Sequence, residues 1–208
     1  MHTGTLRIAA VGPFHATDMI AAFKLRYPKL DVTVQLANSQ KSFERLLAYE
    51  ADVGLIAEVK IDPRVTTTSY SEHEVVIFVH ERHPFFERKS IAIDELDGEW
   101  VILREQGSTT RIAMERALAA RGVTVKPVLE IGSREGVWKA DEQGLGIGYV
   151  ADFEFVPHPR LRTVRISDAE IRTKYYLAFL TDRRDARLVK AFCDVALQVR
   201  TDREESQA

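Results

Sequence analysis

Residues 6–57 decide the fold of this 208-residue chain: LRIAAVGPFHATDMIAAFKLRYPKLDVTVQLANSQKSFERLLAYEADVGLIA. Short apolar runs, Leu6–Val11, Val32–Leu36 and Val53–Ala57, alternate there with two helical patterns, and this alternation predicts a βαβαβ unit. Strands in such a unit run parallel and their crossover connections are right-handed. The sequence therefore predicts a mixed α/β fold built on a parallel sheet.

The same alternation returns in the second half of the chain. It comprises a strand at Trp100–Leu103, a helix at Thr109–Arg121, a strand at Val128–Ile131, a helix at Arg134–Gln143 and a strand at Ile147–Val150. Two strand-like runs, residues 64–70 and 73–80, stand between the two units, and residues 157–171 are rich in turn residues. A strand at Tyr175–Leu180 and a final helix around residues 188–199 complete the pattern.

These two units predict two Rossmann-like lobes joined by two crossover strands, an arrangement like a clamshell. We expect lobe I to comprise residues 5–78 and 172–200, lobe II residues 79–171, and the polar tail 201–208 to be disordered. Ligands of open parallel sheets bind beyond the carboxyl ends of the strands. The strand-to-helix junctions are therefore the places to search for a site.

Composition excludes several classes of protein. With 45% hydrophobic and 29% charged residues, the chain has enough apolar material for a core and enough charge for a polar surface. Its 29 basic and 31 acidic residues give a net charge of −2. The chain therefore lacks the strongly positive field that binds the phosphate backbone of DNA. No apolar run approaches the length of a membrane span, and Cys193, the one cysteine, is expected in the core. We expect a cytoplasmic protein without a membrane partner.

The strand-to-helix junctions carry hydroxyl and amide side chains where helices begin. The candidate ligand-binding residues at these junctions are Pro13, Phe14 and His15, then Asn38, Ser39 and Gln40, then Gln106, Gly107, Ser108 and Thr109, and finally Ser133 and Arg134. Such residues are also ordinary helix N-caps, which need no ligand. If several helix N-termini share one cleft, however, their free amides and partial positive charge favour a small anion.

Charged side chains near the junctions refine this expectation. Among the cations His15, Lys41, Arg111 and Arg134, we rank Arg134 first as a partner of an anion; for Lys41 and Arg111, at helix starts, a solvated side chain is an equal alternative. Glu58 follows the strand Val53–Ala57 and is a candidate partner for an ammonium group on the same ligand; the alternative is a surface carboxylate. Phe14, Phe78 and Tyr176 are candidates for the walls of the cleft or, alternatively, for the core.

No motif points to an enzyme, a metal or a cofactor. Gly144-Leu-Gly-Ile-Gly148 lacks the preceding strand and following helix of a dinucleotide loop, and we interpret it as a turn entering a buried strand. His80 and His83 have no third ligand at a suitable spacing, and Pro84 interrupts any helix there. The sequence therefore favours binding over catalysis.

An ordered set of motifs resembles the effector-binding domain of LysR-type transcriptional regulators. The resemblance spans about residues 5–200, and its motifs are Leu6-Arg-Ile-Ala-Ala, Ala22-Phe-Lys-Leu-Arg-Tyr-Pro28, Asn38-Ser39, Leu46-Leu47, Ala51-Asp-Val-Gly-Leu-Ile-Ala57, Gly107-Ser-Thr-Thr-Arg111 and Gly144-Leu-Gly-Ile-Gly148. It implies a type 2 periplasmic-binding-protein-like clamshell with an effector in the cleft. It also implies homodimers that assemble into tetramers, and DNA binding only through a winged helix-turn-helix that is missing from these residues. We therefore expect the chain to be a fragment of a longer regulator.

Carried across by position, the resemblance places effector contacts on the candidate junction residues other than Arg134, and on Ala57 or Glu58. This sequence departs from many relatives at Gly12-Pro13-Phe14, where a hydroxyl residue is common. Only the backbone amides of Phe14 and His15 are then expected to donate there. Three stretches, Ala9–Thr17, Arg104–Arg111 and Glu130–Glu135, are similar to the subgroup associated with aminoethylphosphonate catabolism. The resemblance thus implies 2-aminoethylphosphonate or another oxyanion as effector. A solute-binding protein of a transporter for a small anion is the alternative.

Overall fold

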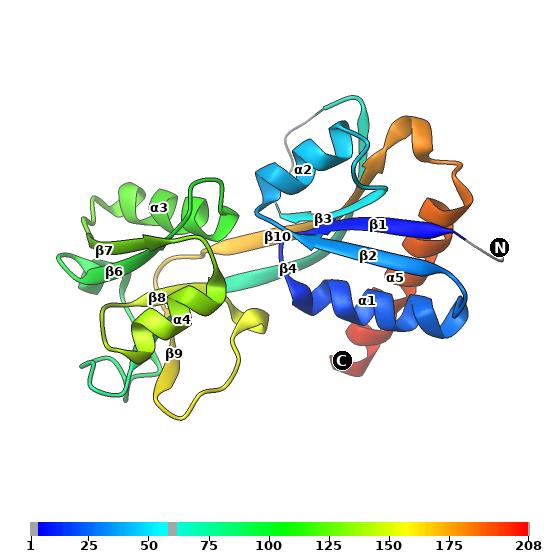
Figure 1. Ribbon diagram of the computed structural model, residues 1–208. Coiled ribbons are helices and arrows are strands. Elements are labelled where there is room, and N and C mark those ends of the chain that lie inside the picture. The colour runs from blue at the N-terminus through cyan, green and yellow to red at the C-terminus, as the bar shows by residue number, and fades with distance from the viewer. Residues whose placement is uncertain (1–3, 58–61, 208) are drawn as a thin grey trace. The chain divides into compact units, whose positions relative to one another are not determined.

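The computed structural model describes residues 4–57 and 62–207 (Figure 1). The chain forms two compact units: unit 1 comprises Met1–Ser71 and Lys174–Ala208, and unit 2 comprises Glu72–Thr173. We expected the boundaries after residues 78 and 171; in the structure, residues 72–78 and 172–173 lie in the second unit. Two strands, β4 (Val65–His80) and β10 (Arg172–Leu180), contribute residues to both units.

Unit 1 is built on the predicted parallel strands. Its elements are β1 (Thr5–Ala10), α1 (Pro13–Arg26), β2 (Asp31–Leu36), α2 (Ser39–Leu47), β3 (Val53–Ala57), the first part of β4, most of β10, a 3₁₀ turn at Thr181–Arg183 and α5 (Arg187–Gln207). Strand β1 lies between β2 and β3 and is parallel to both, with Ala10 paired to Leu36 and to Leu55. Strand β10 is antiparallel to β3. The carboxyl ends of the three parallel strands therefore meet at one edge of the sheet.

Alternation along β1 divides the core of unit 1 between the two faces of its sheet. Leu6 and Ile8 pack with Phe23 of α1 and Phe192 of α5. Ala9 instead packs with the buried side chains of α2. Figure 1 shows α1 and α2 on opposite sides of the sheet.

Unit 2 contains a second set of parallel strands. Its elements are the second part of β4, β5 (Ser90–Ile91), a 3₁₀ turn at Ile93–Leu96, β6 (Trp100–Arg104), α3 (Thr109–Arg121), β7 (Lys126–Ile131), α4 (Arg134–Glu142), β8 (Gly148–Ala151), a 3₁₀ turn at Asp152–Glu154, β9 (Leu161–Ile166) and the start of β10. Strands β6 and β7 are parallel, and β6 also forms a parallel bridge with Ile147. Strand β4 pairs antiparallel with β8 and β9. The predicted βαβαβ order is thus present in both units.

Strand β4 carries two cores in unit 2, one on each face. Ile77 packs with α3 residues such as Met114, whereas Phe78 packs with Val137 of α4. Phe78 is fully buried, so it belongs to the core rather than to a cleft wall. A Cβ on Gly148 would lie 2.2 Å from the Phe78 ring, which explains why a glycine begins β8. The segment 144–148 is therefore a turn entering a buried strand, as the sequence predicts.

Three predicted elements differ in the structure. The runs 64–70 and 73–80 form one long strand, β4, and the turn-rich segment 157–171 contains β9. The tail that we expected to be disordered continues α5 to Gln207. Arg203 in this last part of α5 donates hydrogen bonds to the His15 ring and to the Asp18 carboxylate of α1, so it ties the end of α5 to α1.

Candidate functional site

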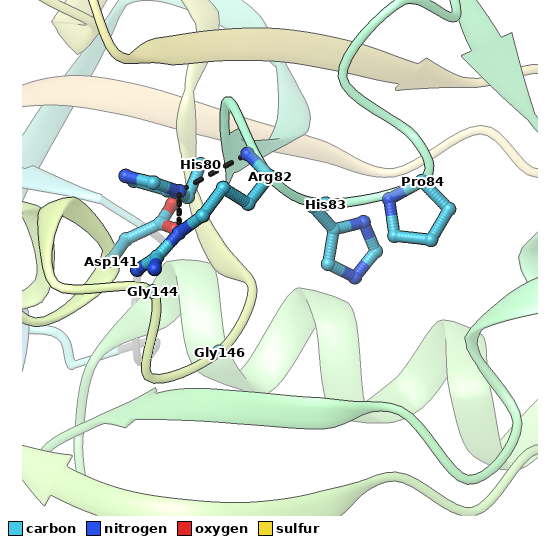
Figure 2. Close-up of a pocket in the computed structure, with 7 residues that line it drawn as sticks. All are labelled: His80, Arg82, His83, Pro84, Asp141, Gly144 and Gly146. Atoms are coloured by element: carbon cyan, nitrogen blue, oxygen red, sulfur yellow. Dashed lines mark hydrogen bonds between the residues drawn. The ribbon is translucent and has the colours of Figure 1, made fainter.

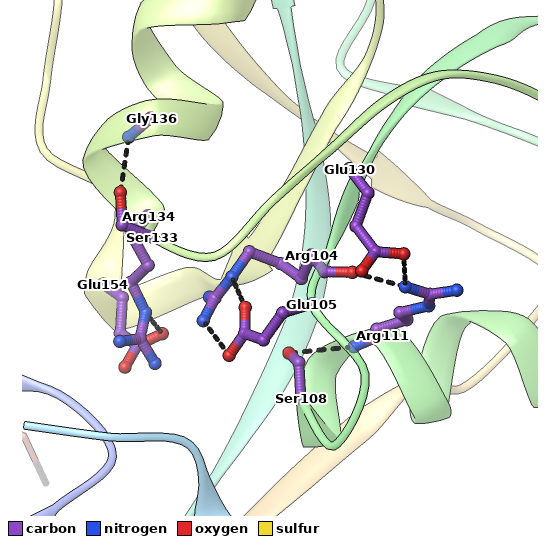
Figure 3. A network of polar contacts seen from close by, with 9 residues as sticks. All are labelled: Arg104, Glu105, Ser108, Arg111, Glu130, Ser133, Arg134, Gly136 and Glu154. Atoms are coloured by element: carbon purple, nitrogen blue, oxygen red, sulfur yellow. Dashed lines mark hydrogen bonds and ion pairs between the residues drawn. The ribbon is translucent and has the colours of Figure 1, made fainter.

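In unit 2 the two parallel strands β6 and β7 end side by side, and a helix begins after each. Arg104 at the end of β6 pairs with Ile131 at the end of β7. The Ser108 hydroxyl accepts the backbone N–H of Arg111 at 3.5 Å and caps α3, and the Ser133 hydroxyl accepts that of Gly136 at 3.0 Å and caps α4 (Figure 3). Two helix N-termini therefore lie at one edge of this strand pair.

A tight turn connects β6 to α3. Gly107 has φ of +84°, a left-handed conformation that favours glycine, and the Ser108 amide donates to the Glu105 carbonyl at 3.2 Å. Ser108 itself is buried, whereas Gln106 is exposed and Thr109 is half-buried at the first turn of α3. The sequence-predicted residues of this junction are thus together, with Gly107 shaping the turn.

Arg104 and Glu105 form a fork at this edge that sequence reasoning missed. The Nε and Nη2 atoms of Arg104 donate to the two carboxylate oxygens of Glu105 at 2.9 and 3.1 Å. Arg104 is buried and Glu105 is half-buried. The bidentate geometry is the one in which arginine binds a carboxylate or phosphate, so this guanidinium is positioned for planar anion recognition.

Arg134, ranked first among the cations, is paired within unit 2. Its Nε donates to the Glu154 carboxylate at 2.8 Å, and Glu154 is only 1% exposed. Burial raises the pKa of Glu154, while the positive charge of Arg134 opposes that rise. Nothing local in the sequence signals this pair, because its members are 20 residues apart.

Arg111 has a structural position. Its Nη1 donates to the Arg104 carbonyl at 2.6 Å and to Glu130 at 2.7 Å, and its Nε donates to Glu115 at 2.7 Å. These contacts hold α3 against the ends of β6 and β7. Arg111 therefore positions the junction, which corrects its interpretation as a cation for the ligand.

In unit 1 the second junction is also capped. The Asn38 side chain accepts the Lys41 amide at 3.0 Å and begins α2, and Gln40 is exposed and donates to Glu44. Ser39 is buried: its hydroxyl donates to the Ala57 carbonyl and accepts the Ala57 amide at 3.0 Å. Ser39 therefore fastens α2 to the end of β3, a structural role that makes it a poor ligand contact.

The first junction places His15 in the interior of unit 1. Pro13 and Phe14 are half-buried at the start of α1, after the extended Gly12. His15 is buried, its Nδ1 lies 2.8 Å from Nη1 of Arg203, and its Nε2 lies 3.1 Å from the Ser71 hydroxyl. Because arginine only donates, Nδ1 accepts and the ring proton lies on Nε2. The His15 side chain is therefore held in the core by Arg203 and Ser71, and its role as a contact of the ligand stays a prediction.

The junction residues fall into two sets, one in each unit, and Glu58 lies outside the described residues. Tyr176 is half-buried and packs against the core beneath α2, on the sheet of unit 1.

No group of three or more potential metal ligands occurs within residues 4–57 and 62–207. No helix in those same ranges has the length and apolar character of a membrane span.

A comparison with protein families places this geometry in a known context. The family model described as LysR substrate binding domain matches residues 1–201. This chain belongs to that family.

Individual relatives of this LysR-type domain agree with the family match. The regulator CysL of Bacillus subtilis is 30% identical over 151 residues, which cover 71% of this chain and 50% of the relative. The activator CmpR of Synechocystis is 24% identical over 196 residues, which cover 92% of this chain and 64% of the relative. The chain therefore spans about half to two thirds of the length of these curated relatives, both of which are named transcriptional regulators.

A solved structure confirms the predicted fold. The regulatory domain of CcmR from Synechocystis PCC6803, in complex with 2-PG, superposes with a TM-score of 0.86 at 24% identity, covering 95% of this chain and 97% of that one. The mixed α/β fold of LysR effector-binding domains, a type 2 periplasmic-binding-protein-like fold, is thus the fold of this chain.

Proposed function

We propose that this chain is the ligand-sensing part of a LysR-type transcriptional regulator and that its effector is a small anion. The family membership and the names of the curated relatives support a regulatory role over an enzyme or a transporter's solute-binding protein. In the full-length regulator, DNA is bound through a separate N-terminal domain. Effector binding changes the affinity for DNA by favouring one of two conformations of the regulator.

One observation carries the anionic effector: the capped N-termini of α3 and α4 lie at the shared carboxyl edge of β6 and β7, with the Arg104 fork beside them. Each helix start offers backbone N–H groups and a partial positive charge, and these favour an anion. Ser108 and Ser133 are the hydroxyl donors nearest to those starts. In unit 1, the junctions Phe14–His15 and Asn38–Gln40 also offer backbone amides at helix starts.

Glu105 makes this site selective. In the structure its carboxylate occupies both donors of the Arg104 fork. An effector anion replaces it there, because a ligand oxyanion and the Glu105 carboxylate compete for the same guanidinium N–H groups. A neutral ligand gains nothing from this exchange, so the site discriminates by charge.

An aminophosphonate is the finer form of the proposal. Its oxyanion suits the two helix starts, and its ammonium group suits a carboxylate such as Glu58, which lies outside the described residues. The solved relative that contains 2-PG supports effector binding in this fold, although its ligand belongs to that protein.

Thermal unfolding with added ligands tests the proposal. We expect 2-aminoethylphosphonate or another small oxyanion, chosen from phosphate, sulfate and carboxylates, to raise the melting temperature. The double variant Ser108→Ala, Thr109→Ala should bind at least about tenfold more weakly while still folding, since even one lost hydrogen bond to a charged ligand costs about 1.5–3 kcal/mol. Thr124→Ala, at the opposite end of α3, is the matched control.

Two outcomes would contradict the proposal. The first is the absence of stabilisation by every anion in the panel at about 10 mM, where a ligand with a Kd of about 1 mM still stabilises by more than 1 kcal/mol. The second is a loss of folding in the double variant, which would leave Ser108 as a helix cap only.

A further inference from the structure

A pocket of about 350 Å³ lies in unit 2 at the carboxyl end of α4. It is formed by the end of β4, the turn that follows, the last turn of α4 and the loop before β8. The lining residues are His80, Arg82, His83, Pro84, Asp141, Gly144 and Gly146 (Figure 2). Because α4 is 9 residues long, this end lies about 13 Å from the N-terminus at Ser133. The pocket is therefore separate from the site described above.

Asp141 brings a buried carboxyl group to this pocket. The residue is 1% exposed, and within the described part of the chain its Oδ2 atom has no hydrogen-bond partner. Burial raises the pKa of Asp141 to about 8, although the backbone N–H groups of Gly148 and His80 oppose the rise. At neutral pH the carboxyl group therefore carries a proton, and it is a hydrogen-bond donor without an acceptor.

His80 is surrounded by donors. Its Nε2 lies 2.7 Å from Nη2 of Arg160, and its Nδ1 lies 3.1 Å from the backbone N of Arg82. Burial lowers the pKa of His80, so the ring is neutral and carries one N–H group. Because Nδ1 accepts the Arg82 amide, the ring proton lies on Nε2, which faces Arg160. His80 therefore fixes the turn that carries Arg82.

Arg82 adds an exposed guanidinium to the same wall. Its Nη2 lies 3.5 Å from the Gln143 carbonyl, and no carboxylate among the described residues forms an ion pair with it. The nearby acids are already engaged: Glu81 accepts from Arg160 at 3.0 Å, and Glu99 lies 3.5 Å from the His83 ring. Within the described residues, the Arg82 guanidinium therefore gives this wall of the pocket a positive charge that no carboxylate neutralises directly.

We propose that this pocket is a second ligand site, which takes a small oxyanion such as inorganic phosphate or sulfate. An oxyanion is rich in hydrogen-bond acceptors, and it bridges the Arg82 guanidinium and the Asp141 carboxyl proton. To bind the anion, the Arg82 guanidinium gives up its 3.5 Å contact with the Gln143 carbonyl. The inference does not depend on the effector at the α3 and α4 N-termini.

Titration with inorganic phosphate, followed by ¹H–¹⁵N NMR, tests this site. The backbone amides of Gly144 and Gly146 should shift and saturate with a Kd of about 1 mM or tighter. Arg82→Ala should weaken that binding at least about tenfold, because it removes a charge-assisted donor pair. Arg82→Gln, which keeps a long polar side chain, gives the same answer if the alanine variant is unstable. Sodium chloride at matched ionic strength corrects for screening.

Two control variants separate this site from the first one. Arg187→Ala removes an exposed arginine of unit 1 and should leave the Gly144 and Gly146 shifts unchanged. The Ser108→Ala, Thr109→Ala variant should keep them as well, although it weakens effector binding at the other site. The inference is overturned if phosphate at about 10 mM leaves both amides unmoved, or if the Arg82 variants bind it as the unaltered chain does.

Discussion

At the scale of single residues, Asp141 makes the stability of the protein depend on pH. Its pKa is about 8 in the folded state, against an ordinary value of 3.8. The folded state therefore holds the proton more tightly than the unfolded state, so this group stabilises the fold most below pH ~4 and loses that effect as the pH rises toward 8. Asp141→Asn should remove this loss, which amounts to at most about 6 kcal/mol.

Urea unfolding at several pH values measures this prediction. The free energy of unfolding of Asp141→Asn, relative to the unaltered chain, should increase steadily from pH 5 to pH 8, because only the aspartate must lose a proton. Asp185→Asn, at an exposed aspartate, should give a constant difference over the same range. A constant difference for Asp141→Asn would show that its carboxyl group titrates normally.

Residues whose partners are local were predictable from the sequence, and those with distant partners were not. Asn38, Ser108 and Ser133 each cap a helix by bonding an amide three residues ahead, a contact that sequence spacing encodes directly. Arg134 and His15 depend on partners 20 and 188 residues away. Only the tertiary fold brings those partners close. The sequence alone therefore could not show that Glu154 pairs with Arg134 or that Arg203 binds the His15 ring.

At the scale of elements, the strongly periodic segments were predictable and the weakly patterned ones were not. The order of β1 to β3 follows from apolar runs bounded by clear helical patterns. In β9 the buried residues Leu161, Val164 and Ile166 do not alternate strictly, and prolines precede the strand. The end of α5 is polar, and its order comes from contacts with α1 that no local pattern records.

The docking of the α5 end gives a prediction at this scale. Arg203 donates to the buried His15 ring at 2.8 Å and also pairs with Asp18, whose side chain is half exposed. Arg203→Ala should lower the free energy of unfolding by about 1–2 kcal/mol, mainly through the lost bond to a buried ring. Chemical denaturation measures the effect, and Glu205→Ala on the same exposed turn is the control. Equal stabilities of the two variants would mean that the tail docks without contributing to stability.

At the scale of the whole molecule, unit 1 presents apolar side chains that its own core does not cover. Leu36 and Val34 on β2 are 57% and 39% exposed, and Leu25 on α1 is 87% exposed. Strand β2 is the edge strand on the unit 1 side of the sheet order, and its Val34 and Leu36 share one face. Exposed apolar side chains on one face of an edge strand, as Val34 and Leu36 are, are typical of an association surface.

The family resemblance implies a homodimer. We therefore expect a second copy of this chain to pack against the exposed apolar side chains of β2. Sedimentation velocity should therefore detect a dimer, and Leu36→Glu should raise the dimer dissociation constant at least about tenfold, because a buried carboxylate without a partner costs more than the ~1.4 kcal/mol of one decade. Leu145→Glu introduces the same charge at an exposed leucine of unit 2 and should leave association unchanged. A symmetric dimer repeats each contact twice, so even one substitution per chain acts on both halves of the interface. A monomer in the unaltered chain at about 100 μM, or equal weakening by both substitutions, would remove β2 from the interface.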